Sequence, residues 1–435
     1  MTSTLGDVAL LVKDKVDPAV AAESNYLGLE HVEAHTMRII GNGRGSDVKS
    51  AKTRFRPGDV LYGKLRPYLN KVAKPEFEGI CSTDFLVFRE SEQLDAGYLA
   101  QFLNQLWVAE QAHHISAGVE LPRVDWKGLS SFPISYPTSK EAQRAIVQSI
   151  EAARSHAGSA SVHLDGSVRA IQRLRQAVLA SACSGRLTAD WREANPDAKS
   201  VSDALNELRS GKKVRRQREQ AVSLPLPDLP DSYVISSVGD CSVMVEYGTS
   251  QKCVADPAVG VPVLRMGNIQ DGKLDLSDLK YCSVDDEIDG LMLEPGDLLF
   301  NRTNSPELVG KSAVYRAEVP ASFASYLIRV RFDRQAALPE FINYWLNSAW
   351  GRAWAQLAKT DGVSQSNING SKLALMPVPL PPIDEQAVIV ERASRMLLSA
   401  NAIQSRVESA SSAVDRSSQA VLAKAFRGQL SAAGL

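Results

Sequence analysis

A polar loop in the last quarter of the chain carries side chains that are well suited to hydrogen-bond chemistry. Its sequence is SQSNIN, at 364–369, and five of its residues are candidates for a binding site: Ser364, Gln365, Ser366, Asn367 and Asn369. Amide side chains both donate and accept, so Gln and Asn can form paired hydrogen bonds with adenine N6 and N7 in the major groove of DNA. The same residue types also form Asx turns that cap helices. Composition alone leaves these two interpretations equal.

Cationic and polar residues at strand ends and in loops form a second set of candidates. The stretch NRTN at 301–304 follows a predicted strand, and an Arg there suits guanine O6 and N7 or a phosphate. The alternative is a charged strand end that faces water. Together with its counterpart GKLRP in the first half of the chain and the separate predicted loop YGTSQK, the candidates are Lys64, Arg66, Arg123, Thr249, Gln251, Lys252, Asn301, Arg302, Thr303, Asn304 and, as a phosphate contact, Lys311. Arg123 is included because it aligns with Asn367 in the internal repeat described below.

Motifs for catalysis or metal binding are incomplete. Gly310-Lys311-Ser312 resembles the end of a phosphate-binding loop, but position 305 is Ser where that loop needs Gly. The stretch HVEAH at 31–35 is not HExxH and offers no obvious third ligand for zinc. We therefore expect a chain that is not an enzyme and that binds no cofactor or metal itself.

Bulk composition is that of an ordinary globular protein of several domains. The net charge of −1 over 435 residues gives no global field that would attract a polyanion, so any nucleic-acid surface must be local. The five cysteines form no CxxC pair, and this odd, scattered set favours reduced thiols over a disulfide framework. No signal peptide or membrane-spanning run is evident, so we expect a cytoplasmic protein without a membrane partner.

The chain is one long unit written twice. QAVLASACSGRLTA from Gln176 matches QAVLAKAFRGQLSA from Gln419, at an offset of 419 − 176 = 243. Further anchors follow in the same order: FRPGDVLYGKL matches LEPGDLLFNRT at 295 − 57 = 238, and Pro133 matches Pro377 at 377 − 133 = 244. Each unit predicts a mixed α and β segment, with strands entered from the Pro-Gly turns, followed by a long helix. PEFINYWLNSAWGRAWAQLA at 339–358 predicts one further helix, as does its counterpart at 97–113.

Two long helices share the same heptad spacing. Apolar or small residues recur at intervals of four and three over 421 − 389 = 32 steps, about 48 Å of helix. The larger residues of the two predicted seams are Ile146, Ile150, Leu164, Ile171, Leu174 and Val178 in the first, and Ile389, Met396, Ile403, Val407, Val414 and Val421 in the second. Such exposed helices are unstable alone. Their matched register favours a pair over two helices that each pack on their own domain.

The segment between the units is basic and then rich in proline. A run of Lys and Arg at 212–218 precedes SLPLPDLP at 223–230. A solvated linker and an arm that contacts phosphates are equally compatible with this composition.

At this point the motifs resemble a known family. GDLLFNRTNSPELVGKSAVY, VPVLRMGNIQDGKLDL, GVSQSNINGSKL and PVPLPPIDEQAVIVERA are similar to the specificity (S) subunit of type I restriction–modification systems, and the likeness covers essentially the whole duplicated chain. The first unit is more divergent, with GVELPRVDW in place of the loop rich in Ser, Gln and Asn. The resemblance moves the balance for 364–369 towards DNA contact.

The resemblance implies an α+β fold with two target recognition domains and two antiparallel spacer helices. The implied boundaries are 1–137 and 230–380 for the recognition domains, 138–190 and 381–435 for the spacer helices, and 191–229 for the linker. Each recognition domain would bind one half of a split, asymmetric DNA site. The helices would dock two methyltransferase (M) subunits, and restriction (R) subunits would add cleavage. S-adenosylmethionine, ATP and Mg would be bound by those partners.

Alternatives to this assignment are few. A specificity subunit of a related methyltransferase–nuclease system with a different cleavage partner is a close variant. An enzyme with an unrecognised site and a coiled-coil assembly protein without a role on DNA are the others.

Overall fold

The chain folds into two compact units of mixed α and β structure, each assembled from distant parts of the sequence. The computed structural model describes residues 1–118, 120–211, 222–363 and 365–426. Unit 1 comprises Met1–Gly166 and the described part of Val407–Leu435, and unit 2 comprises Ser167–Arg406. The long helices α5 (Lys140–Cys183) and α13 (Ile383–Phe426) each contribute to both units. The α+β fold class expected from the sequence is confirmed.

Unit 1 is built on two small sheets covered by short helices. A four-stranded sheet has the order β2-β10-β7-β8, a five-stranded sheet has the order β3-β6-β9-β4-β5, and β1 pairs with β11. The elements before α5 are β1 Thr2–Thr4, α1 Leu5–Val8, β2 Leu10–Val12, β3 Lys15–Val16, β4 Asn25–Leu27, η1 Leu29–His31, β5 Gly43–Arg44, η2 Gly45–Asp47, β6 Lys52–Phe55, β7 Val60–Gly63, η3 Pro67–Leu69, β8 Val72–Ala73, β9 Gly79–Cys81, β10 Phe85–Arg89, α2 Ala96–Leu103, α3 Leu106–His114, α4 Trp126–Leu129 and β11 Pro133–Ser135.

Unit 2 repeats this plan around a larger core. Its four-stranded sheet has the order β13-β22-β18-β20, and β12 pairs with β25. Between α5 and α13 its elements are η4 Arg186–Thr188, α6 Ala189–Ala194, α7 Ser202–Gly211, β12 Val234–Ser237, α8 Val238–Cys241, β13 Ser242–Tyr247, η5 Pro257–Val259, β14 Val261–Leu264, η6 Met266–Asn268, β15 Ile269–Gln270, β16 Lys273–Leu274, β17 Lys280–Cys282, α9 Asp286–Gly290, β18 Leu298–Asn301, β19 Thr303–Asn304, β20 Ser312–Val314, β21 Ser322–Phe323, β22 Leu327–Phe332, α10 Pro339–Asn347, α11 Ala349–Ala358, β23 Thr360–Asp361, β24 Ser366–Asn367, α12 Gly370–Ala374 and β25 Pro377–Leu380.

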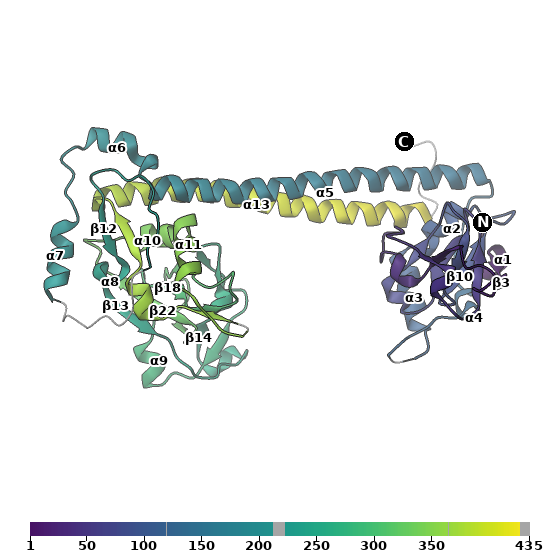
Figure 1. Ribbon diagram of the computed structural model, residues 1–435, viewed down its shortest axis with the longest axis horizontal. Coiled ribbons are helices and arrows are strands. Elements are labelled where there is room, and N and C mark those ends of the chain that lie inside the picture. Colours follow the sequence, from purple (N-terminus) through teal and green to yellow (C-terminus); the bar gives the residue numbers. More distant parts are fainter. Residues whose placement is uncertain (119, 212–221, 364, 427–435) are drawn as a thin grey trace. The chain divides into compact units, whose positions relative to one another are not determined.

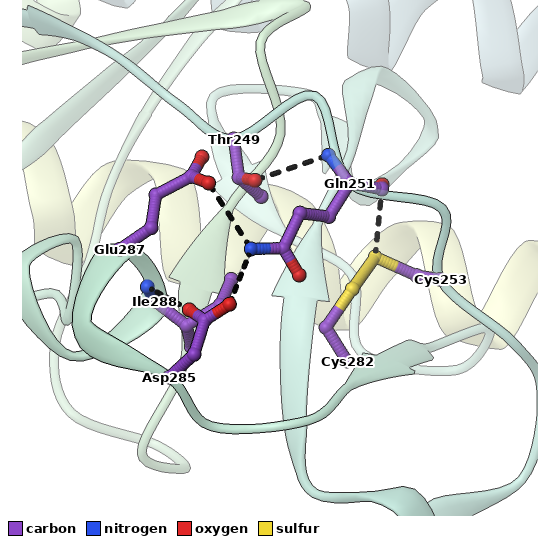
Figure 2. The surroundings of a disulfide bond; sticks show 7 residues. All are labelled: Thr249, Gln251, Cys253, Cys282, Asp285, Glu287 and Ile288. Atoms are coloured by element: carbon purple, nitrogen blue, oxygen red, sulfur yellow. Dashed lines mark hydrogen bonds between the residues drawn. A yellow bond between two sulfur atoms is a disulfide. The ribbon is translucent and has the colours of Figure 1, made fainter.

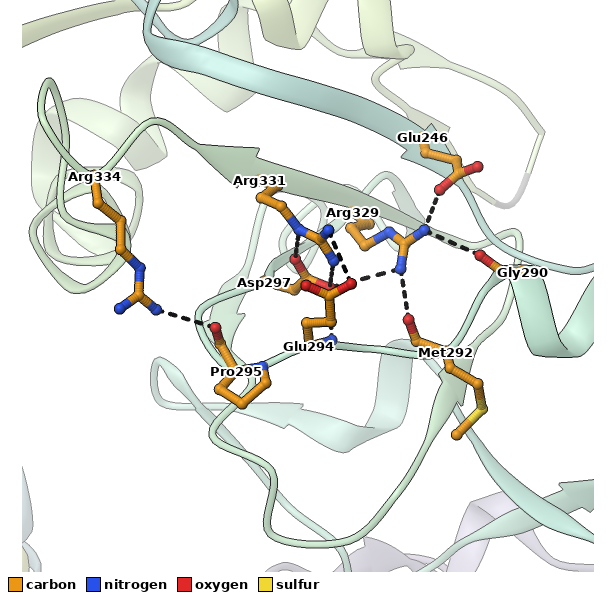
Figure 3. A network of polar contacts seen from close by, with 9 residues as sticks. All are labelled: Glu246, Gly290, Met292, Glu294, Pro295, Asp297, Arg329, Arg331 and Arg334. Atoms are coloured by element: carbon orange, nitrogen blue, oxygen red, sulfur yellow. Dashed lines mark hydrogen bonds and ion pairs between the residues drawn. The ribbon is translucent and has the colours of Figure 1, made fainter.

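The repeated Pro-Gly-Asp turn is explained by the ion pair that it forms. In unit 2 the backbone N–H of Glu294 donates to Asp297 (2.9 Å), and Arg331 donates to both oxygens of that carboxylate (2.7 and 3.0 Å; Figure 3). In unit 1 Asp59 receives the same two kinds of contact, from the N–H of Arg56 and from Arg89. The Gly of each turn has positive φ, +85° at Gly58 and +96° at Gly296, which favours glycine there. The turn therefore fixes the entry of the buried strands β7 and β18.

The single helix predicted over 339–358 is wrong, because the chain forms two. Helix α10 ends at Asn347 and α11 begins at Ala349. Between them Ser348 is extended (φ −70°, ψ 168°), and its hydroxyl accepts from the N–H of Gly351 and donates to the carbonyl of Trp345. A buried N-cap thus interrupts a continuous apolar pattern. Unit 1 has the same break between α2 and α3.

The two long helices have bounds that the repeat relates residue by residue. Helix α5 spans 44 residues, α13 spans 44, and both ends differ by 383 − 140 = 426 − 183 = 243. In unit 2 Arg175 of α5 donates to Asn401 and Gln404 of α13. In unit 1 Ile146 and Ile150 share a core with Ala425. Within each unit the helices therefore lie side by side and run in opposite directions (Figure 1).

The apolar seam predicted along these helices is only partly buried. Ile146, Ile150, Ile171, Val178 and Ile389 are buried, and Leu164, Val407, Val414 and Val421 are half-buried. The prediction is wrong for Leu174, Met396 and Ile403, which are 41%, 42% and 46% exposed. Ala393 and Ala400, two small residues of the same predicted seam, are fully buried, and Arg175 adds polar contacts between the helices.

The predicted linker at 191–229 contains ordered structure that packs on unit 2. Helix α7 buries Leu205, and Val222, Leu224 and Leu226 pack against the core of the unit. The buried carboxylate of Glu385 in α13 accepts hydrogen bonds from Thr188 (2.6 Å) and Tyr233 (3.2 Å), on either side of this segment. The basic run at 212–218 lies outside the described residues.

One cysteine pair corrects the expectation of reduced thiols. Cys253 and Cys282 form a disulfide, with Cα atoms 4.9 Å apart (Figure 2). Val254 pairs with Tyr281 in an isolated β-bridge, which brings the two cysteines side by side although 29 residues separate them. Cys81, Cys183 and Cys241 are free and buried.

Candidate nucleic-acid interface

A small three-stranded sheet in unit 2 joins two of the stretches that the sequence singled out. Strand β24 pairs with β19 on one side and with β23 on the other, in the register Thr303↔Asn367↔Thr360. The backbone N–H of Ile368 also donates to the carbonyl of Arg302 (2.8 Å). The stretches 301–304 and 364–369 therefore form one site, although more than sixty residues separate them in the sequence.

Arg302 is the fixed cation of this site. Its guanidinium donates to the side-chain oxygen of Asn367 (3.2 Å) and to the carbonyl of Ser325 (3.3 Å), and it lies over the ring of Tyr247, 4.7 Å from the centroid. The amide of Asn367 in turn donates to the hydroxyl of Thr303 (2.7 Å). Arg302 is half-buried and, among the described residues, pairs with no carboxylate. A planar guanidinium held in this way can present its remaining donors to guanine O6 and N7 or to a phosphate.

The other predicted residues of the polar loop differ in what they can still bind. Gln365 is exposed, and its side chain is free to contact a ligand. Ser366 is fully buried and donates to Asp361, and Asn369 caps α12 by accepting from the N–H of Lys372 (2.8 Å). The helix-capping interpretation therefore holds for Asn369. Ser364 lies outside the described residues.

The two Asn residues of the NRTN stretch differ in burial. Asn301 is fully buried, and its amide nitrogen and oxygen have no hydrogen-bond partner among the described residues. A DNA contact by this side chain in the described conformation is therefore contradicted, because Asn301 ends the buried strand β18 and packs inside the unit. Asn304 is half-buried, and its side-chain oxygen accepts from the N–H of Ser305 (2.8 Å).

The loop after β13 lies beside Arg302. The backbone N–H of Ser325 donates to the carbonyl of Thr249 (2.7 Å), and the carbonyl of Ser325 accepts from Arg302. The side chain of Gln251 donates to Asp285 (2.8 Å) and Glu287 (3.1 Å; Figure 2). The hydrogen bonds from Thr249 and then from Gln251 lower the pKa of Glu287, so the carboxylate stays charged near neutral pH.

Of the three residues predicted in this loop, Lys252 alone is exposed. Thr249 is 2% exposed, so its hydroxyl acts inside the loop, where it accepts from the N–H of Gln251 (3.1 Å). A direct DNA contact by Thr249 is contradicted for this reason. Lys252 forms no ion pair among the described residues and remains available to an anion.

Lys311 does not join the Arg302 site. Its ammonium donates to the side chain of Gln270 (3.1 Å), and burial lowers its pKa. Ser312 after it begins strand β20, where a phosphate-binding loop would begin a helix.

Unit 1 reproduces the backbone of the site with different side chains. Arg123 forms β-bridges with Leu65 and Ala117, and these three positions correspond to Asn367, Thr303 and Thr360 at offsets of 244, 238 and 243. Lys64 takes the place of Arg302. Arg123, at the position of Asn367, is a second cation of this region. It is exposed and donates to Asp84 (3.2 Å). Arg66 is also exposed and adopts a left-handed backbone (φ 50°) as the N-cap of η3.

Aromatic residues are the part of this site that sequence reasoning missed. Tyr247 and Tyr326 are both 44% exposed and both contact the Arg302 segment, through the ring of Tyr247 and through the carbonyl of Tyr326, which accepts from the N–H of Arg302 (3.0 Å). The available signal was Tyr247 itself, immediately before the polar stretch GTSQK. Exposed aromatic rings beside a fixed Arg offer faces on which a nucleobase can stack.

Metal and membrane chemistry are not indicated within the described residues. No group of three or more His, Cys, Asp and Glu that could hold a metal ion occurs there. None of the described helices is long and apolar enough to cross a membrane.

Comparisons with known proteins agree on one family. No protein-family model matches the chain. It is 28% identical over 357 residues to the type I restriction enzyme EcoKI specificity subunit of Escherichia coli K12, covering 80% of this chain and 68% of that protein. It is 30% identical over 195 residues to the EcoDI specificity subunit of Escherichia coli, covering 44% of this chain and 43% of that protein.

Solved structures show the same fold. A chain from a study of complex assembly and conformational transition of the type I R-M system matches with a TM-score of 0.68 and 21% identity, covering 99% of this chain and 98% of that one. The HsdS subunit of Thermoanaerobacter tengcongensis matches with a TM-score of 0.53 and 22% identity, covering 99% and 97% of the two chains. The curated relatives are specificity subunits of type I restriction enzymes, and this chain is similar to them in sequence and to the solved HsdS subunit in fold.

Proposed function

We propose that this chain recognises double-stranded DNA as the specificity subunit of a type I restriction–modification complex, and that it catalyses no reaction itself. The observation that carries the proposal is a backbone pairing that recurs in both units with different side chains, as a three-stranded sheet in unit 2 and as isolated β-bridges in unit 1. Unit 2 presents Arg302, Asn367 and Gln365 on this ladder, and unit 1 presents Lys64 and Arg123. Two similar scaffolds with unlike side chains are suited to two unlike half-sites.

The expected target is a split and asymmetric DNA site. Helix α5 has 44 residues, which is about 66 Å of α-helix and about two turns of B-DNA. We propose that the α5–α13 pair sets the length of the unrecognised gap between half-sites. The two equally long helices of a duplicated chain would also offer two equivalent docking sites to two copies of a methyltransferase subunit. Restriction subunits, and the S-adenosylmethionine, ATP and Mg bound by partners, complete the proposed complex.

Base contacts and backbone contacts in unit 2 can be separated by substitution. Replacing Gln365 or Asn367 with Ala in the complex with the methyltransferase subunit is expected to relax sequence choice in one half-site. Uniform weakening on all DNA sequences would instead identify phosphate contacts. Sequencing of the methylated adenines that the complex produces gives both half-sites and the gap together.

The chain alone supplies the control for catalysis. Purified and incubated with a labelled methyl donor and DNA, it is expected to transfer no methyl group until methyltransferase subunits are added. Methylation without added subunits would contradict a non-catalytic role. An assembled complex whose DNA binding is the same on every sequence would contradict the recognition role.

A further inference from the structure

A crevice in unit 2 has the properties of a small-molecule site. It lies between helix α10, the strands β16 and β20, and the facing parts of α5 and α13, and it encloses about 500 Å³. Leu179, Leu274, Val314 and Leu397 provide apolar walls. All of its lining residues belong to unit 2. The crevice is thus a concave apolar pocket of the size that binds small ligands.

The charge in this crevice is unbalanced in favour of cations. Five cationic side chains and three carboxylates line it: Arg175, Lys273, Lys311, Arg316 and Arg352, against Asp271, Glu318 and Glu340. Arg175 is paired with Asp271 (2.8 Å). Lys311 and Arg352 are half-buried, and among the described residues they donate to neutral groups, Gln270 for Lys311 and the carbonyls of Glu307 and Val309 for Arg352. Burial lowers the pKa of both groups, and the charge of Asp271 opposes this effect at Lys311.

A tyrosine hydroxyl in the crevice also has no partner among the described residues. Tyr344 of α10 is 8% exposed and lines the crevice. Its hydroxyl forms no hydrogen bond with any residue that the structure describes, and the charge of Arg316 acts on it. The crevice therefore offers a donor as well as cations to a ligand.

The internal repeat places different side chains at the equivalent position of unit 1. By the offset of 243, Tyr344 corresponds to Gln101 and Leu397 to Arg154. In unit 1 Arg154 donates to Gln101 (3.4 Å) and contacts the sulfur of Met37 (3.9 Å), and all three residues line a pocket of about 860 Å³. A pocket is therefore present in both units, and the apolar wall that Leu397 forms in unit 2 is replaced by an arginine in unit 1.

We propose that the crevice of unit 2 binds a small organic anion, with its anionic group at Lys311, Arg352 and Arg316 and its apolar body between Leu397 and Tyr344. This site is separate from the Arg302 ladder, and the proposal does not depend on DNA recognition. The anion would compensate the two half-buried cations and accept a hydrogen bond from Tyr344.

The probe for this site is 8-anilinonaphthalene-1-sulfonate, which combines one sulfonate with an apolar body and fluoresces when bound. Titration of the full chain is expected to saturate at one site per chain. Lys311→Gln should weaken binding roughly tenfold through loss of an ionic hydrogen bond. The double substitution Tyr344→Gln with Leu397→Arg, which copies unit 1, should abolish binding. Lys199→Gln, at an exposed position outside the crevice, is the matched control and should leave binding unchanged.

The outcomes decide the proposal in either direction. Saturable binding that weakens about tenfold in Lys311→Gln and is unchanged in Lys199→Gln supports it, whether or not the double variant folds. Circular dichroism and the unfolding temperature show that each variant compared is native. Fluorescence that does not saturate, or that is equal in all variants, overturns it.

Discussion

Gln143 and Gln386, which are 243 residues apart, form the same three hydrogen bonds in their two units. The side-chain oxygen of Gln143 accepts from the N–H of Asp95, and its amide donates to the carbonyls of Gln93 and Pro137, all at 2.8 Å. Gln386 accepts from the N–H of Leu338 and donates to the carbonyls of Ala336 and Pro381, at 2.8, 3.0 and 3.0 Å. Both side chains are fully buried. Each amide therefore joins the first turn of a long helix to the strand-to-helix connection of its unit.

Replacing either Gln with Ala is expected to loosen one unit only. The substitution leaves an N–H and two carbonyls of the backbone without partners, which costs roughly 2–4 kcal/mol in the free energy of unfolding. Hydrogen exchange should show loss of protection in unit 1 for Gln143→Ala and in unit 2 for Gln386→Ala. Gln148→Ala, at an exposed position of α5, is the control. Equal loss in both units would mean that the contacts do not act locally.

Arg302→Lys is expected to impair DNA recognition while the unit stays folded. A lysine keeps the charge but cannot donate to Asn367 and Ser325 together while its remaining donors face the DNA, and it stacks less well on Tyr247. We expect a loss of about 1–3 kcal/mol, roughly 5- to 150-fold in affinity, for the correct half-site. Competition binding with specific and unrelated DNA measures this. A loss that is equal on unrelated DNA would show that Arg302 contacts phosphate.

Much of the fold could be predicted from repetition, because matching anchors report equivalent structure even where each signal is weak. The Pro-Gly-Asp turns, the strands that follow them and the long helices are such cases. The helix break and the contacts between the long helices depend instead on hydrogen bonds of individual side chains. Ser348 breaks a helix because its hydroxyl caps the next one, and Arg175 displaces Leu174 from the helix contact because Asn401 and Gln404 receive its hydrogen bonds. These depend on tertiary partners that periodicity does not contain.

The candidate site was predictable in part for the same reason. Arg302 and Asn367 were identified from residue type, and their common ladder required the pairing of β19 with β24. Asn301 and Thr249 have equally suitable side chains, and their burial excludes them in the described conformation. Asn301 is buried at the end of β18, whereas its neighbour Arg302 is half-buried. A single polar stretch therefore cannot tell which of its members reach solvent.

Counting accessible thiols tests the Cys253–Cys282 disulfide. Burial raises the pKa of Cys81 to about 12 and raises that of Cys183 also, so these thiols stay protonated at pH 8, and the protonated form is the unreactive one. Native protein is expected to react with no equivalent of a thiol reagent at pH 8, and protein in denaturant with three. Five equivalents in denaturant without prior reduction would show that Cys253 and Cys282 are free thiols.

Lengthening both long helices is expected to change the gap between half-sites. Two insertions of four helix-forming residues, one after Gly158 of α5 and one after Ala413 of α13, add about 6 Å to each helix. Gly158 has open space around it and Ala413 is exposed, so neither insertion disturbs a buried contact at its own position. Because B-DNA rises about 34 Å in 10 base pairs, the preferred gap should grow by one or two base pairs. The measurement is the spacing of methylated adenines produced by the reconstituted complex.

An insertion in α5 alone removes the match between the helices and should weaken assembly with methyltransferase subunits. If the doubly extended chain assembles normally and keeps the original gap, the α5–α13 pair does not set it.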